Sequence, residues 1–230
     1  MSDGFQHAYG ACGIEYRGTH FQGWQRLRKD GRNVQSCVET ALSRVADHEV
    51  TTACAGRTDS GVHARYQVVH FDTEAERDMH GWVLGCNTHL PGDVSVLWAQ
   101  PVEDRSCAVL GDCPHLPLLY SQPHGAAGAA ARSGNLGMPA TGCHAHAGRC
   151  RKRLIGEHDF SGYRALSCQS TSPVRHVRRL TVCRQDEYIV IAIEANAFVH
   201  HMVRNIAGVL MTIGKGKADV AWSAEILAGR

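Results

Sequence analysis

The chain has 230 residues, which is enough for one large domain or two small ones. Its hydrophobic content of 43% and charged content of 20% are typical of a soluble globular protein. The formal net charge of +2 excludes a global positive field, so a nucleic-acid site has to be a local basic patch.

Signals for export or membrane insertion are not found. No apolar run is long enough to span a bilayer, and the first ten residues lack the charged-then-apolar pattern of a secretory signal. We therefore expect a cytoplasmic protein without membrane contact. Its ten cysteines are then expected to be reduced thiols rather than disulfides.

The first part of the chain alternates strand and helix signals. Strands are predicted over residues 11–16, 50–54 and 67–71, and from Val94 onward, because β-branched residues cluster or apolar residues alternate there. A helix is predicted after Asn33, a favourable N-cap. Its apolar face consists of Val34, Cys37, Val38, Ala41, Leu42 and Val45.

A second helix is predicted from a capping box at residues 73–76 to about Cys86. The order strand, helix, strand, strand, helix, strand is the split βαβ pattern, which packs helices on an antiparallel sheet.

Two loops of this part carry candidate chemistry. Residues 17–26, RGTHFQGWQR, mix aromatic rings with guanidinium groups, which suits contact with nucleic acid. In the alternative interpretation, Phe21 and Trp24 only fill the edge of the core. Residues 56–63, GRTDSGVH, place Asp59 between glycines that let a backbone approach a ligand. The alternative here is an ordinary hairpin turn, since Asp and Gly are common turn residues.

Residues 106–150 differ from their surroundings in composition. They hold nine Ala, seven Gly, four Pro, four Cys and four His, and no Lys, Glu, Ile, Phe or Trp. One interpretation is a flexible linker. A second is a zinc site, although the spacing matches no standard ligand pattern. Its candidate ligands are Cys143, His144, His146 and Cys150.

The C-terminal part returns to regular patterns. Strands over 177–182 and 188–195 are predicted to pair across a short polar turn, and a helix is predicted to begin at Trp222. Between the second of these strands and Trp222, a long helix is predicted to end at Gly214 and Gly216. Its apolar stripe consists of Val199, Met202, Val203, Ile206, Leu210 and Ile213.

Three motifs resemble signatures of the TruA family of tRNA pseudouridine synthases. They are YRGTHFQGWQR at 16–26, GRTDSGVH at 56–63 followed by QVVHF, and NAFVHHMVRNI at 196–206. The likeness covers about residues 11–104 and 154–228.

The resemblance implies an α+β fold with two ferredoxin-like subdomains, whose mostly antiparallel sheets are flanked by helices and form a central catalytic cleft. We accordingly expect an N-terminal α/β subdomain over 1–104, an aberrant segment over 105–153 and a truncated C-terminal α/β subdomain over 154–230. Family members continue beyond this C-terminus, so the C-terminal sheet is expected to lack a strand.

The implied function is an isomerase that converts uridine to pseudouridine at positions 38–40 in the anticodon stem-loop of tRNA, without a cofactor or metal. A homodimer is expected, with tRNA spanning both subunits. Asp59 corresponds to the nucleophile and Arg204 to its ion-pair partner. The expected substrate-binding residues are Arg17, Gln25, Arg26, Arg57, Thr58, His63, Arg65 and Arg164.

Two alternatives remain open. One is a catalytically defective relative that still binds tRNA. The other is a generic single-stranded-RNA-binding protein of ferredoxin-like fold, which predicts exposed aromatic residues on sheet strands.

The family also suggests an origin for the unusual middle segment. Permissible codons for residues 106–118, read one nucleotide later, give His-Ala-Arg-Tyr-Ser-Ala-Ile-Ala-Arg-Thr-Tyr-Leu, which resembles the family strand at this point. A pair of compensating frameshifts near Arg105 and Cys150 explains this fit. The family tyrosine that packs on the target base lies in this strand, and its codon would overlap Leu116 and Pro117.

Re-reading the DNA that encodes residues 100–155 tests the frameshift hypothesis. We expect the alternative frame to contain family sequence between two single-nucleotide changes. A clean single frame with no family sequence in the alternative frame contradicts it.

Overall fold

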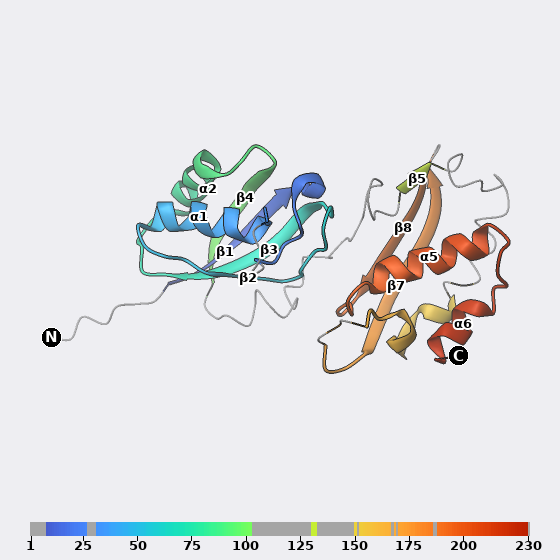
Figure 1. The fold of residues 1–230 in the computed structure, drawn as a ribbon. Coiled ribbons are helices and arrows are strands. Elements are labelled where there is room, and N and C mark those ends of the chain that lie inside the picture. Colours follow the sequence, from blue (N-terminus) through green and yellow to red (C-terminus); the bar gives the residue numbers. More distant parts are fainter. Residues whose placement is uncertain are drawn as a thin grey trace. The chain divides into compact units, whose positions relative to one another are not determined.

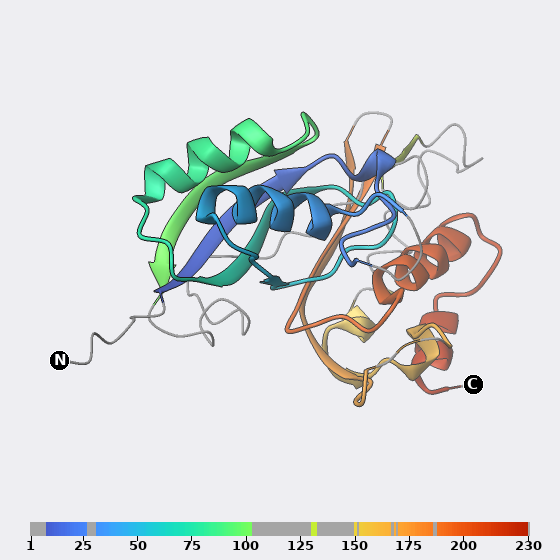
Figure 2. The ribbon, with the colours of Figure 1, turned by 60° about the vertical axis from the view of Figure 1, so that its left-hand side comes forward.

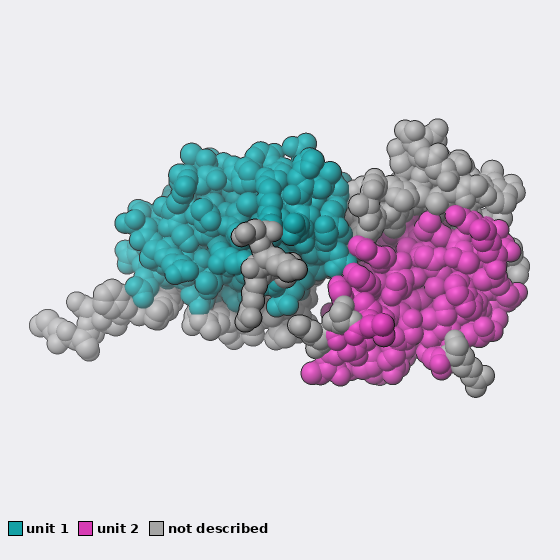
Figure 3. Space-filling view, viewed as in Figure 1, with its two compact units in different colours: residues 1–116 teal, residues 117–230 magenta. Residues whose placement is uncertain are grey.

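A computed structural model describes most of the chain. The described residues are 8–26, 31–102, 130–132, 150, 152–166, 168, 170–185 and 188–229. The chain divides into two compact units, residues 1–116 and 117–230 (Figure 3). Each unit has its own hydrophobic core.

Unit 1 is a four-stranded antiparallel sheet with two helices packed on one face (Figures 1 and 2). The predicted order of strands and helices in this unit is confirmed. Its elements are β1 (Ala8–Tyr16), the 3-10 turn η1 (Gly18–His20), α1 (Val34–Ala46), β2 (Thr52–Cys54), β3 (Ala64–Thr73), α2 (Met79–His89) and β4 (Val94–Val102). In the sheet the strands follow the order β2-β3-β1-β4, so the first strand is central.

Helix α1 forms for the reasons that its sequence indicates. The Asn33 side chain accepts a hydrogen bond from the Ser36 N–H at 2.8 Å and so caps the first turn. Val34, Val38 and Leu42 are buried against the sheet, as the apolar stripe predicts.

The predicted start of the second helix is wrong. Thr73 is the last residue of β3 and pairs with Ala8 of β1. Its hydroxyl accepts the Ala75 N–H at 3.0 Å, which makes a local turn instead of a capping box. The N-cap of α2 is Asp78, whose carboxylate accepts the Gly81 N–H at 2.7 Å, and the helix continues to His89.

An irregularity in strand pairing interrupts the alternation predicted for β4. Val94 and Val96 face the core, but the register shifts next to the pair of Gly13 and Trp98. Trp98 therefore lies on the opposite face of the sheet, against Gly13 and beside the ring of Tyr66 at 6.1 Å. Tyr66 is 45% exposed, which makes it an accessible aromatic side chain on a sheet strand.

Unit 2 is a second four-stranded antiparallel sheet, with order β5-β8-β7-β6 (Figure 1). Its elements are β5 (Ala130–Arg132), β6 (Gly156–Asp159), the 3-10 turn η2 (Ser161–Tyr163), β7 (Val174–Gln185), β8 (Tyr188–Ala195), α5 (Met202–Gly214) and α6 (Trp222–Leu227). The two antiparallel sheets with flanking helices confirm the predicted α+β class.

The long helix α5 supplies one side of the core of unit 2. Met202, Ile206, Leu210 and Ile213 are each at most 2% exposed, as the apolar stripe predicts. Gly216, just beyond the helix, has a φ of +70°, a conformation that favours glycine and ends the helix.

Little of the aberrant segment belongs to the described residues. Residues 130–132 pair with β8 as a short edge strand. Of the candidate zinc ligands, Cys143, His144 and His146 lie outside the described residues. Leu116 and Pro117, which the codon of the family tyrosine would overlap, also lie outside them. Cys150 is fully buried, and its thiol contacts the Val220 carbonyl oxygen at 3.8 Å, so it packs in the core of unit 2.

Within the part of the chain that the structure describes, no helix combines the length and apolar character needed to cross a membrane.

The core of unit 1 can be tested with two leucines of different burial. Leu42 on α1 is fully buried, whereas Leu84 on α2 is 55% exposed. Leu42→Ala is expected to lower the free energy of unfolding by about 2–5 kcal/mol, because it leaves a cavity. Leu84→Ala is expected to change it by less than about 0.5 kcal/mol. Urea unfolding measures both, and similar losses for the two variants would contradict this packing.

Candidate functional site

The loop that carries Asp59 is fixed by backbone hydrogen bonds on both sides of this residue. The Trp24 N–H donates to the Thr58 carbonyl oxygen at 2.9 Å, and the Gly61 N–H donates to the Phe21 carbonyl oxygen at 3.1 Å. The Val62 N–H closes a turn on the Asp59 carbonyl oxygen at 3.2 Å. Asp59 is half-buried between these contacts. We call this set of contacts between residues 21–24 and 58–61 the backbone clamp.

Two glycines allow the two loops to approach so closely. Gly23 has a φ of +102°, and a Cβ atom there would lie 2.7 Å from the Thr58 carbonyl oxygen. A Cβ atom on Gly18 would lie 1.8 Å from the Val62 carbonyl oxygen. The glycines of the first motif are therefore required by contact with the second motif.

The aromatic residues of the first motif are buried. Phe21 is 2% exposed and Trp24 is 1% exposed, so the interpretation that they fill the core edge is the correct one. Tyr16 is also buried, and its hydroxyl forms a hydrogen bond with Thr58 Oγ1 at 2.7 Å. Tyr16 thus contacts the Asp59 loop through its hydroxyl group, and the three buried rings present no stacking surface.

The remaining predicted residues of the second motif lie on or next to the same loop. Arg57 and Arg65 are exposed, and His63 is half-buried. The side-chain amide of Gln67, a buried residue of β3, donates to the Gly56 carbonyl oxygen and fixes the base of the loop. Burial raises the pKa of the neighbouring Cys54 thiol to about 11, although the charge of Arg57 opposes this shift.

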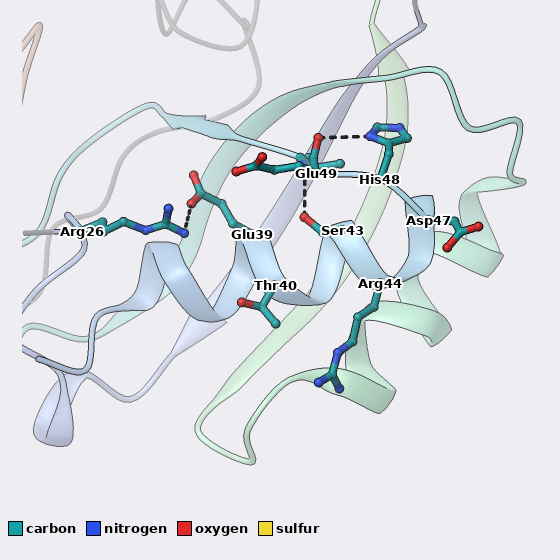
Figure 4. A pocket seen from close by; sticks show the side chains of 9 residues that line it. Arg26, Glu39, Thr40, Ser43, Arg44, Asp47, His48 and Glu49 are labelled. Carbon is teal, nitrogen blue, oxygen red and sulfur yellow. Dashed lines mark hydrogen bonds and ion pairs between the residues drawn. The ribbon is translucent and has the colours of Figure 1, made fainter. Parts of the chain in front are cut away.

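Gln25 and Arg26 are held on helix α1. Gln25 Nε2 and the Arg26 N–H both donate to Gln35 Oε1, at 3.0 and 2.9 Å. The Arg26 guanidinium forms an ion pair with Glu39 at 2.7 Å (Figure 4). Both predicted residues therefore sit in fixed positions beside the backbone clamp.

Arg17 is directed to a different turn. Its backbone N–H donates to the Asp93 carbonyl oxygen at 2.9 Å, and its guanidinium donates to the Gly92 carbonyl oxygen at 3.3 Å. This turn also binds the side chain of Arg32, a residue that none of the three sequence motifs includes. Arg32 makes two hydrogen bonds to the Asp93 carboxylate, at 2.6 and 2.7 Å, and lies 4.1 Å above the Phe21 ring.

The ion pair of Arg32 with Asp93 shifts the pKa values of both groups. The hydrogen bond from Arg32 lowers the pKa of Asp93, and the same bond raises the pKa of Arg32. No local pattern could have indicated this pair, because its members are 61 positions apart in the sequence.

In unit 2, the loop over residues 163–168 is bound to the segment that starts helix α5. The Ala165 N–H donates to the His200 carbonyl oxygen at 3.0 Å, and Asn205 Nδ2 donates to the Tyr163 carbonyl oxygen at 2.8 Å. Arg164 donates to the Cys168 carbonyl oxygen at 2.7 Å. Arg204, in the first turn of α5, is half-buried.

Cys168 joins the same network through its sulfur atom, which accepts the His200 N–H at 3.3 Å. Burial acts to raise the pKa of this thiol. The N–H groups of His200 and Ser170, together with the Arg164 guanidinium, outweigh it and lower the pKa below the ordinary value. Arg164 and Arg204 are thus held on two connected segments of unit 2.

A pocket of about 470 Å³ lies along helix α1 (Figure 4). It is lined by Arg26, Glu39, Thr40, Ser43, Arg44, Asp47, His48, Glu49 and Val50. Its walls carry both signs of charge, and Asp59 is not among them. This pocket is therefore separate from the Asp59 loop. Arg26, which lies beside the backbone clamp, also lines the pocket.

Comparison with known proteins gives consistent matches. The curated relatives include "tRNA pseudouridine synthase A" of Methylococcus capsulatus, which is 49% identical over 96% of this chain and 81% of the relative. The proteins of the same name from Nitrosococcus oceani and Vibrio cholerae are 47% and 44% identical, over 96% and 95% of this chain and 85% and 82% of the relatives.

A family model described as tRNA pseudouridine synthase matches residues 13–109 and 151–230. The gap between the two matched stretches, residues 110–150, falls in the segment of unusual composition. With matches over most of its length on both sides of that gap, the chain belongs to the tRNA pseudouridine synthase family.

Proposed function

We propose that this protein isomerises uridine to pseudouridine in the anticodon stem-loop of tRNA, with Asp59 as the nucleophile. The observation that carries the proposal is the backbone clamp, which holds a half-buried carboxylate between two glycine-permitted contacts. The relatives named tRNA pseudouridine synthase A support an isomerase that acts on tRNA.

A carboxylate suits this reaction. The C1′–N1 glycosidic bond breaks and a C1′–C5 bond forms, so the product is an isomer and no electrons are gained or lost. The hydrogen of C5 leaves as a proton, and N1 gains a proton. A carboxylate can attack covalently, either at the sugar C1′ or at the uracil C6, and later leave.

Arg204 is proposed to stabilise the negative charge of Asp59. Asp59 belongs to unit 1 and Arg204 to unit 2. The proposed pairing therefore rests on the resemblance of the third motif to the family signature. The half-buried position of Arg204 in the first turn of α5 supports it, since a guanidinium in that environment favours an acidic partner.

Basic residues around the loop are proposed to bind tRNA phosphates. Arg57 and Arg65 are exposed beside Asp59, and Arg26 is fixed on the other side of the backbone clamp. Thr58, His63 and Gln25 complete this surface, and Arg17 and Arg164 are proposed as outlying contacts. Such contacts make binding weaken as salt increases. We further propose a homodimer, following the family resemblance.

The target uridine has to leave the base stack, which costs a few kcal/mol. An aromatic side chain that stacks on the base offsets this cost, and the family supplies a tyrosine for it. Leu116 and Pro117, which the codon of this tyrosine would overlap, fall within the unmatched residues 110–150. This departure favours a second candidate function, in which the chain binds tRNA with reduced or no catalysis. Among the described residues, the exposed Tyr66 on β3 fits the alternative of a generic RNA-binding protein.

Release of tritium from tRNA labelled at C5 of uridine tests the proposal. Asp59→Asn preserves shape but removes the nucleophile, so we expect release to fall at least about a thousandfold while tRNA binding persists. Glu15→Ala, which removes an exposed carboxylate on β1, serves as the control and is expected to release tritium at the wild-type rate.

The outcomes separate the candidates. Substantial release by Asp59→Asn would contradict Asp59 as the nucleophile. A wild-type chain that binds tRNA without release would establish the binding function in place of catalysis.

A further inference from the structure

Glu39 is a buried carboxylate that the proposed chemistry does not use. It lies on helix α1 and is 4% exposed. One oxygen, Oε2, pairs with the Arg26 guanidinium at 2.7 Å (Figure 4). The other, Oε1, accepts from Gln35 Nε2 at 2.9 Å, from the Thr52 N–H at 2.9 Å and from Thr52 Oγ1 at 3.2 Å.

This arrangement satisfies the charge of Glu39 on all sides. A buried carboxylate without partners is strongly unfavourable, and here four contacts compensate for its burial. Buried ion pairs are nevertheless poor sources of net stability, because well-packed apolar residues often do as well. A role in orienting its partner therefore explains a buried acid at this position better than stability does.

The partner, Arg26, is fixed but remains accessible. Its side chain is 53% exposed even though it is paired. Nε donates to Ser36 Oγ at 3.1 Å, and one terminal nitrogen contacts Glu39. A guanidinium has five N–H donors in a rigid plane, so these two contacts leave further donors available on a half-exposed side chain.

The position of Arg26 is tied to the Asp59 loop through the main chain. Arg26 is two residues beyond Trp24, whose N–H forms the backbone clamp with Thr58. The Trp24 carbonyl oxygen in turn accepts the Gln35 N–H at 3.0 Å, at the start of α1. Two residues of extended chain span only about 7 Å. A phosphate close to a nucleotide at Asp59 is thus within reach of the Arg26 side chain.

We propose that Glu39 is a positioning residue for RNA binding. It holds the Arg26 guanidinium so that its outward N–H groups meet a phosphate of the tRNA next to the target nucleotide. A planar guanidinium binds phosphate with two parallel hydrogen bonds, and a pre-oriented side chain loses less entropy on binding. This inference rests on the proposed function, which supplies the RNA.

Glu39→Gln gives a test in which two explanations predict opposite signs. The amide keeps an acceptor toward Thr52 but no longer attracts Arg26. If Glu39 only neutralised Arg26, its removal would add positive charge and tighten tRNA binding. The positioning role predicts instead that Kd and KM for tRNA rise about 2- to 10-fold, with the single-turnover rate at saturating tRNA unchanged.

A double-mutant cycle connects the effect to Arg26. Arg26→Gln is expected to weaken binding, and Glu39→Gln is expected to have no further effect in that background. Glu49→Gln, which removes an exposed acid at the far end of the same pocket, is the control and is expected to bind tRNA like the wild type. Urea unfolding confirms that the compared variants are folded.

Tighter or unchanged binding by Glu39→Gln overturns the inference, as does an equal loss in the presence and absence of Arg26. If Glu39→Gln does not fold, Arg26→Lys takes its place. That variant keeps the charge but lacks the planar fork, so its Kd for tRNA is expected to rise about 2- to 10-fold. Binding at the wild-type Kd overturns the inference. Assays of the wild-type protein test the proposed function separately from the variants. A wild-type protein that neither binds nor modifies tRNA contradicts that function.

Discussion

The central constraint in unit 1 is the close contact between the main chains of residues 21–24 and 58–61. Two N–H to carbonyl hydrogen bonds join them on either side of Asp59. Glycine is needed because a side chain at position 23 would collide with the Thr58 carbonyl oxygen. A flexible loop would lose conformational entropy each time a carboxylate is aligned, whereas this loop is aligned on folding.

Helix α1 extends this constraint from the main chain to charged side chains. Gln35 in its first turn accepts hydrogen bonds from Gln25 and Arg26, and Glu39 pairs with the Arg26 guanidinium. The buried face of the helix packs against the sheet. A comparable organisation occurs in unit 2, where Asn205 of α5 and the backbone of His200 bind the loop over 163–168. In both units, polar groups near candidate site residues are held by contacts distant in sequence.

Much of the fold could be predicted from the sequence because its signals are local. The Asn33 cap and the apolar stripes of α1 and α5 specify helices by spacing alone. The predicted capping box at Thr73 failed because pairing of Thr73 with Ala8 outweighs a local preference for a helix start. Arg32 with Asp93, and Glu39 with Arg26, could not be predicted because tertiary folding alone brings these residues together.

The importance of the backbone clamp for catalysis can be measured with glycine variants. In Gly23→Ala, the added Cβ atom would lie 2.7 Å from the Thr58 carbonyl oxygen at a φ of +102°, whereas in Gly92→Ala it would meet nothing within 4 Å. We expect the single-turnover rate of tritium release to fall at least about tenfold in folded Gly23→Ala and to stay at the wild-type value in Gly92→Ala. Equal rates for wild type and Gly23→Ala would contradict the account.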